Sequence, residues 1–129
     1  ENLRCFVDSH AAHSSSMWFG HKLRENGQRG SAFVSGAAGY LLSRELIGRL
    51  LNAIGDGSCQ GTTRERSQPG LLLAKCLRKF TEPVELEDPL SHSPMLHVYG
   101  PVRLISGEVD SWWQKYRQNA GVATQSGVA

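Results

Sequence analysis

The sequence predicts an α/β fold, because short apolar runs typical of strands alternate with longer amphipathic stretches typical of helices. Residues 17–20 and 32–34 are too short for helices and are rich in aromatic or branched side chains. Residues 43–54 and 70–80 carry apolar side chains at helical spacing. A chain of 129 residues is expected to form one domain.

Composition excludes several classes of function. The net charge is only +2, and no block of basic residues interleaved with aromatics predicts nucleic-acid binding. No apolar run approaches the roughly 20 residues that span a bilayer, and no signal-peptide pattern is present. Cys5, Cys59 and Cys76 lack the spacing of a zinc site. One disulfide with a free thiol and three reduced thiols both remain open.

The first thirty residues predict one helix end, a loop, a strand and a turn. Residues 1–7 carry apolar side chains at i, i+3 and i+4, which indicates the end of a helix. Residues 8–16 are polar; His10 and His13 could ligate a metal in a helix, but the serine-rich setting favours a solvated loop. After the strand at 17–20, residues 22–30 are polar and are expected to turn.

The clearest helix begins after Ser43. The Ser43 hydroxyl can cap its N-terminus, and the Glu45 carboxylate suits the positive end of the helix dipole. Gly55 or Gly57 is expected to end it. One apolar stripe runs along it, formed by Leu46, Ile47, Leu50, Leu51 and Ile54.

A run of small residues connects the strand at 32–34 to this helix. Its sequence is Ser35-Gly36-Ala37-Ala38-Gly39-Tyr40. Small side chains let a backbone or a ligand approach closely. A packed strand–turn–helix without any ligand explains the same residues, so the segment alone leaves both interpretations open.

The middle of the chain predicts a loop, a second helix and another loop. Residues 56–68 are expected to form the first loop. Pro69 suits the first turn of a helix that continues to residue 80. Residues 81–94 are acidic and proline-rich, which predicts an extended loop.

The C-terminal part gives weaker patterns. Residues 95–99 and 102–105 are candidate strands, and residues 110–118 are a candidate short helix. The two tryptophans of this helix could anchor the core or form the wall of an acceptor site. Residues 119–129 are small and polar and are expected to form a disordered tail.

Several segments are informative as an ordered set. They are Glu1-Asn2-Leu3-Arg4, Met17-Trp18-Phe19-Gly20, Ser35-Gly36-Ala37-Ala38-Gly39-Tyr40-Leu41-Leu42-Ser43-Arg44-Glu45, Cys59, Cys76 and Pro94-Met95-Leu96-His97. In order and approximate spacing, this set resembles the β1,3-glycosyltransferases of the fringe and core 1 galactosyltransferase type. The resemblance runs from residue 1 to about residue 97.

The resemblance implies that residues 1–118 are the acceptor-side half of a GT-A glycosyltransferase domain, which is Rossmann-like. It implies inverting transfer of galactose or a related sugar from a UDP-sugar to the 3-hydroxyl of an acceptor sugar, such as protein-linked N-acetylgalactosamine. In the complete enzyme, Mn²⁺ would neutralise the leaving diphosphate. The implied setting is O-glycan biosynthesis by a type II membrane protein in the Golgi lumen. The signal-anchor and the metal-binding aspartates would precede Glu1, so we expect the isolated chain to be inactive.

The resemblance also implies roles for particular residues. Residues 35–40 would line the floor beneath the donor sugar. Trp18 would form a wall of the acceptor site, with core packing as an equal alternative. Cys59 and Cys76 would form a disulfide, and the His97 imidazole would help to hold the metal.

The catalytic base is the main departure from the family pattern. The Glu-Asp pair of the family falls on Pro69-Gly70. Glu65 could supply a displaced carboxylate, because the segment between the two later cysteines is longer by about one helical turn; a solvated loop charge is the alternative. Without a base, the chain would be a non-catalytic relative that binds or chaperones a transferase. A coincidental likeness in a small globular domain is the third possibility.

Overall fold

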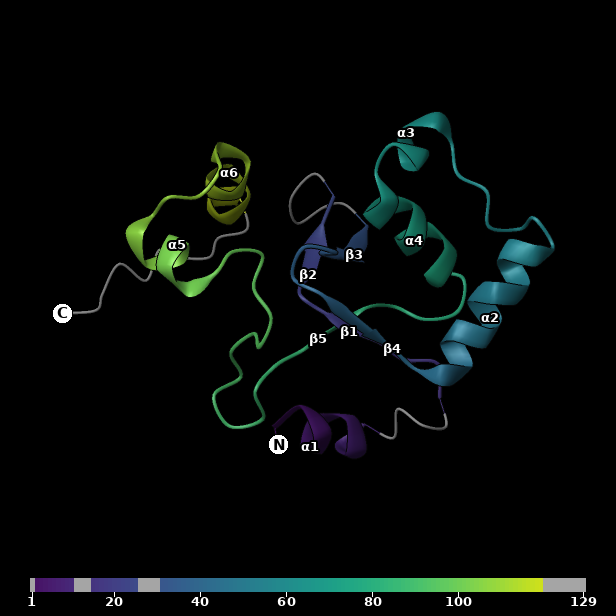
Figure 1. Cartoon of the computed structure of the whole chain (residues 1–129), viewed down its shortest axis with the longest axis horizontal. Helices are drawn as coiled ribbons and strands as arrows, with labels where there is room; N and C mark the ends of the chain where they lie inside the picture. The colour runs from purple at the N-terminus through teal and green to yellow at the C-terminus, as the bar shows by residue number, and fades with distance from the viewer. Residues whose placement is uncertain (1, 11–14, 26–30, 120–129) are drawn as a thin grey trace.

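The structure, a computed structural model, describes residues 2–10, 15–25 and 31–119. It confirms the predicted α/β class, with two small sheets and six helices among the described residues. In Figure 1 the sheets lie at the centre, with α2, α3 and α4 to one side, α5 and α6 to the other, and α1 below.

The larger sheet has three strands, in the order β4-β1-β5. The predicted strand at 17–20 is confirmed as β1 (Trp18–Gly20), which pairs antiparallel with β4 (Tyr40–Leu42) and parallel with β5 (Val84–Glu85). β4 and β5 were not predicted, because the small-residue run was expected to connect β3 to the helix, and residues 81–94 were expected to form a loop. The expected loop at 81–94 is otherwise largely irregular.

The smaller sheet is a two-stranded hairpin. The predicted strand at 32–34 is confirmed as β3 (Ala32–Val34), and it pairs antiparallel with β2 (Lys22–Arg24). Leu23 lies opposite Phe33 and is buried. The prediction of a turn from residue 22 was therefore wrong at its start, because one buried leucine between two basic residues suffices to hold a short strand.

The N-terminal helix is confirmed as α1 (Asn2–Ser9), slightly longer than predicted. Phe6 is buried and meets the ring of Phe19 edge-on, with ring centroids 5.0 Å apart. α1 therefore covers one face of β1. The loop predicted at 8–16 was wrong at its start, because residues 8 and 9 belong to α1; residues 11–14 lie outside the described residues.

The helix expected after Ser43 is confirmed as α2 (Arg44–Gly55). The Ser43 hydroxyl accepts hydrogen bonds from the backbone N–H groups of Leu46, at 3.3 Å, and Met17, at 2.9 Å. Within the predicted stripe, Leu46 is fully buried and Leu50 is half-buried. The rest of the stripe is exposed: Ile47, Leu51 and Ile54.

The second predicted helix is confirmed as α4 (Pro69–Leu77), with Pro69 in its first turn. The expected loop at 56–68 also contains a short helix, α3 (Thr63–Arg66). α2 and α4 pack over β1 and β3 around a core of five buried residues: Trp18, Val34, Leu46, Ala74 and Leu77.

The strands expected at 95–99 and 102–105 were wrong. Residues 95–99 are irregular, and 102–105 belong to α5 (Pro101–Ser106). Pro101 in the first turn and Gly107 at the C-cap, with φ of 75°, explain why a helix forms. The apolar side chains at 102 and 105 are three apart, and this spacing also suits one helix face.

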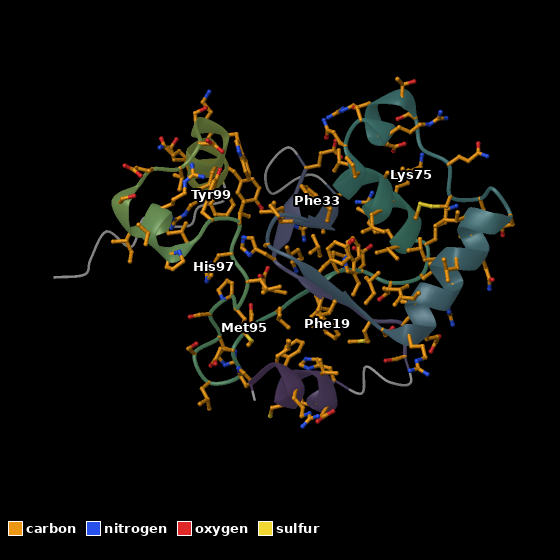
Figure 2. The ribbon with its side chains drawn as sticks, in the orientation of Figure 1. Phe19, Phe33, Lys75, Met95, His97 and Tyr99 are labelled. Carbon is orange, nitrogen blue, oxygen red and sulfur yellow. A yellow bond between two sulfur atoms is a disulfide. The ribbon has the colours of Figure 1, made fainter. Side chains whose placement is uncertain are left out.

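The candidate helix at 110–118 is confirmed as α6 (Ser111–Asn119). It packs against the hairpin through a cluster whose buried members are Leu23, Tyr99 and Trp113. Figure 2 shows Tyr99 beside α5 and α6, and Phe33 on the hairpin. The tail was predicted at 119–129; residue 119 is instead the last residue of α6, and residues 120–129 lie outside the described residues.

Candidate functional site

A cavity of about 360 Å³ opens between the β2–β3 hairpin, the start of α4 and α6. Apolar side chains form much of its wall, and charged side chains also border it. The lining residues are Leu23, Arg24, Glu25, Phe33, Arg64, Gln68, Pro69, Gly70, Leu71, Trp112 and Tyr116. We call it the hairpin cavity.

Backbone and side-chain contacts hold the walls of the hairpin cavity together. The Tyr116 hydroxyl accepts a hydrogen bond of 3.1 Å from the backbone N–H of Arg24, which joins α6 to the edge of β2. The Tyr116 ring stacks on Trp113, which is buried. Trp112 precedes this pair and stays 46% exposed, so it presents an aromatic surface to the cavity.

This arrangement answers the question about the two tryptophans. Trp113 is 8% exposed and anchors the aromatic cluster, whereas Trp112 lines the cavity. The signal in the sequence was the i, i+4 spacing of Trp112 and Tyr116, which places both on one helix face. It could not reveal the hairpin on the opposite wall.

An ion pair crosses the rim of the hairpin cavity. The Arg64 Nη2 atom lies 3.1 Å from the Glu25 Oε1 atom. Both residues, with Leu71, also line a second, smaller cavity of about 170 Å³. No local pattern predicts this ion pair, because the partners lie far apart along the chain.

Glu65 lines the smaller cavity and not the hairpin cavity. Its carboxylate accepts a 2.6 Å hydrogen bond from the backbone N–H of Thr62 and a 3.0 Å bond from Lys75 Nζ. The Thr62 contact, first, and the Lys75 contact lower the pKa of the Glu65 carboxyl. Glu65 lies in α3 and caps this helix in a capping box, so it is not a charge on an irregular loop; its role as a displaced base stays a prediction.

The two positions where the resemblance expects carboxylates both border the hairpin cavity. Pro69 and Gly70 line it at the start of α4. Neither residue has a side chain that can accept a proton. The wall where the resemblance puts a base is therefore made of groups that cannot act as one.

The small-residue segment 35–40 leads into β4 and lines neither cavity. Ser35 is buried, whereas Gly36, Ala37 and Tyr40 are exposed, and Ala38 and Gly39 are intermediate. Gly39 has φ of 85°, a conformation that favours glycine. No described atom would meet a Cβ at Gly36 or Gly39 within 4 Å, so the turn faces open space.

Trp18 is 1% exposed and belongs to the main core. The expectation that it walls an acceptor site is corrected in favour of its alternative, core packing. Its neighbours in that core are Leu46 and Leu77, which leave no ring face open to a sugar.

His97 is exposed, with its ring centroid 6.4 Å from that of His21. His21 Nδ1 lies 3.0 Å from Glu85 Oε1. The part of the chain that the structure describes holds no group of three or more His, Cys, Asp or Glu side chains able to bind a metal. These residues do not form a manganese site by themselves, so no step is assigned to the metal.

The disulfide between Cys59 and Cys76 is confirmed, and it ties the loop after α2 to α4. Cys5 is a free, exposed thiol on α1. The cysteine count left open either one disulfide with a free thiol or three reduced thiols. The structure has one disulfide and a free thiol.

Comparisons with protein-family models, with curated proteins and with solved structures found no match. Within the described residues, no helix has the length and apolar character needed to cross a membrane.

Proposed function

We propose that this chain is the acceptor-side part of a GT-A-like β1,3-glycosyltransferase domain, and that the hairpin cavity receives the acceptor sugar. One observation carries the proposal. Pro69-Gly70, the positions that match the family's catalytic carboxylates, line a cavity that also contains an exposed tryptophan.

The hairpin cavity has suitable properties for a sugar. Its volume of about 360 Å³ falls in the range of about 300–1,000 Å³ usual for small-molecule sites. The Trp112 ring offers a flat apolar surface for the C–H face of a sugar. The Glu25–Arg64 pair offers an acceptor and donors for its hydroxyl groups.

The reaction proposed for the complete protein is inverting transfer of galactose, or a related sugar, from a UDP-sugar to the 3-hydroxyl of the acceptor. Residues 35–40 would lie beneath the donor sugar, and His97 would contribute one ligand to Mn²⁺. Localisation in the Golgi lumen, with an upstream signal-anchor, belongs to the same proposal.

A non-catalytic role is the second candidate, favoured by the Glu65 contacts. A carboxylate that is held by Thr62 and Lys75, with a lowered pKa, is a weak general base. A chain with no other base would bind sugar, or a transferase, without reacting.

Acceptor binding can be tested by nuclear magnetic resonance of the chain. The indole N–H signals report three tryptophans, of which Trp18 and Trp113 are buried and Trp112 is exposed. Titration with an N-acetylgalactosamine glycoside should shift the Trp112 signal and leave that of Trp18 unchanged. Trp112→Ala should weaken binding by about tenfold, equivalent to ~1.4 kcal/mol.

A matched control is Leu90→Ala, which changes an exposed apolar residue that lines neither cavity. It should leave the affinity unchanged. The proposal fails if no indole signal moves at saturating glycoside, or if both variants bind as the wild type does. The isolated chain should show no measurable UDP binding, because the nucleotide half would lie upstream.

A further inference from the structure

We propose that Glu25 is the carboxylate that takes the proton of the acceptor hydroxyl, in place of the Glu-Asp pair replaced here by Pro69-Gly70. This inference rests on the proposed function, because it requires an acceptor sugar in the hairpin cavity. With Glu25 as the base, the replacement of the Glu-Asp pair by Pro69-Gly70 does not abolish catalysis, because the base comes from another wall of the same cavity.

The position of Glu25 follows from the hairpin. Glu25 comes directly after β2, and its backbone N–H donates to the carbonyl oxygen of Ser31 at 3.1 Å. This contact continues the β2–β3 ladder by one more pair. The side chain then borders the hairpin cavity together with Pro69 and Gly70.

Arg64 holds the Glu25 carboxylate from the other side. Its Nη2 atom contacts Oε1 at 3.1 Å, and the Glu25 side chain is about a third exposed, at 32%. A carboxylate has two oxygens with about four lone-pair positions. Oε2 can therefore accept a hydrogen bond from a sugar hydroxyl while Arg64 keeps Oε1 in place.

Glu65 does not have this geometry. Its Oε2 atom accepts from both Thr62 and Lys75, and it borders only the smaller cavity. Among the described residues that line the hairpin cavity, Glu25 is the acidic one. A general base must lie within hydrogen-bond reach of the proton that it removes, so position decides between the two.

The step is a displacement at the anomeric carbon of a nucleoside-diphosphate sugar. As the acceptor oxygen forms its bond to C1, its proton passes to a Glu25 carboxylate oxygen. The bond between C1 and the diphosphate oxygen breaks, and its electron pair leaves with the nucleoside diphosphate. Glu25 then returns the proton to solvent, so no oxidant or reductant is needed.

The test compares Glu25→Gln with Glu65→Gln in the full-length protein, with exposed Glu82→Gln as the matched control. Transfer from UDP-galactose to an N-acetylgalactosamine glycoside is measured, alongside glycoside binding. Glu25→Gln should reduce kcat by about 10²–10⁴-fold, the usual contribution of a general base. Because the Gln amide oxygen still accepts a hydrogen bond, the glycoside affinity should stay within about threefold of the wild type, a difference below ~0.7 kcal/mol. Glu65→Gln and Glu82→Gln should keep wild-type rates.

The outcomes separate this inference from the proposed function. A wild-type protein that binds the glycoside but transfers no sugar overturns the role of Glu25 and leaves acceptor binding intact. Transfer that survives Glu25→Gln does the same. Absence of glycoside binding in the wild type overturns the proposed function itself. Glu25→Asp, which keeps the carboxylate, should restore part of the rate if the Gln variant loses activity for chemical and not folding reasons.

Discussion

The helices α2 and α4 pack against each other, and both were expected from apolar residues at helical spacing, yet their surroundings differ. α4 buries Ala74, Cys76 and Leu77 against α2, α3 and β3. α2 buries Leu46 and Ala53 and leaves Leu51, at 62%, with its apolar neighbours exposed. Hydrophobic spacing thus predicts that a helix forms, whereas the number of elements around it decides how much of its stripe is covered.

The largest expected effect separates a covered position from an uncovered one. Leu77→Ala should lower the free energy of unfolding by about 2–5 kcal/mol, because it leaves a cavity beside Trp18 and Leu46. Leu51→Ala, on the exposed side of α2, should change it by less than about 0.5 kcal/mol. Urea denaturation of the two variants, with the Cys59–Cys76 disulfide intact, measures both changes in the free energy of unfolding. Equal losses would show that the outer side of α2 is covered in solution.

The second largest effect concerns the disulfide, which includes a residue of α4 and none of α2. Reduction of the Cys59–Cys76 bond releases a loop of sequence separation 17, and chain entropy predicts a loss of about 3 kcal/mol. Urea midpoints with and without dithiothreitol measure it. Cys5→Ser is the control, because the loss of this exposed free thiol should leave the urea midpoint at the wild-type value in both conditions. An unchanged midpoint on reduction would contradict the role assigned to the bond.

A smaller effect tests how α2 begins. Ser43→Ala removes the acceptor of the Leu46 and Met17 N–H groups and should cost about 1–2 kcal/mol. Ser93→Ala, at an exposed serine outside the helices, is the control. Thermal unfolding followed by circular dichroism compares the two variants. A loss no larger than that of the control would mean that α2 depends on packing and not on its cap.

The smallest effect depends on pH and on the polar side of α4. Glu65 joins α3 to α4 through Lys75, whereas the Glu45–Arg49 pair lies within α2. The pKa of Glu65 is below its usual value of 4.5 in the folded chain, because the backbone N–H of Thr62 and then Lys75 favour the charged carboxylate. Its contribution to stability should be full above pH 4.5 and lost as the pH falls through the lowered value.

Denaturation of the wild type and Glu65→Gln across this pH range measures the contribution. The two proteins should differ near neutral pH and converge in acid. A difference that persists in acid would mean that Glu65 contributes through packing.

Much of the fold was predictable where the signal is local. The Ser43 cap, Pro69 in the first turn of α4 and the apolar spacing of α1 and α6 depend on neighbouring residues, and all were confirmed. The strand expected at 102–105 was wrong, because Val102 and Leu104, two apart, suit a strand, whereas Val102 and Ile105, three apart, suit a helix face. There the flanking proline and glycine decided in favour of a helix.

The candidate site was less predictable, because its walls come from distant segments. Trp112, Glu25 and Pro69 meet at one cavity although they belong to α6, the end of the hairpin and α4. Trp18, the tryptophan that the resemblance marked for a sugar, lies in the core. A residue's type suggests what it can bind, but burial decides whether a ligand can reach it.

By itself, the sequence determined the α/β class, the starts of α2 and α4 and the presence of cysteines able to pair. These features depend on side-chain spacing, backbone preferences and capping, which act over a few residues. The tertiary structure alone decided which aromatic residue is open, which carboxylate borders the hairpin cavity and which side of α2 stays uncovered. Those outcomes depend on burial and distance between remote segments, and these exist only once the chain has folded.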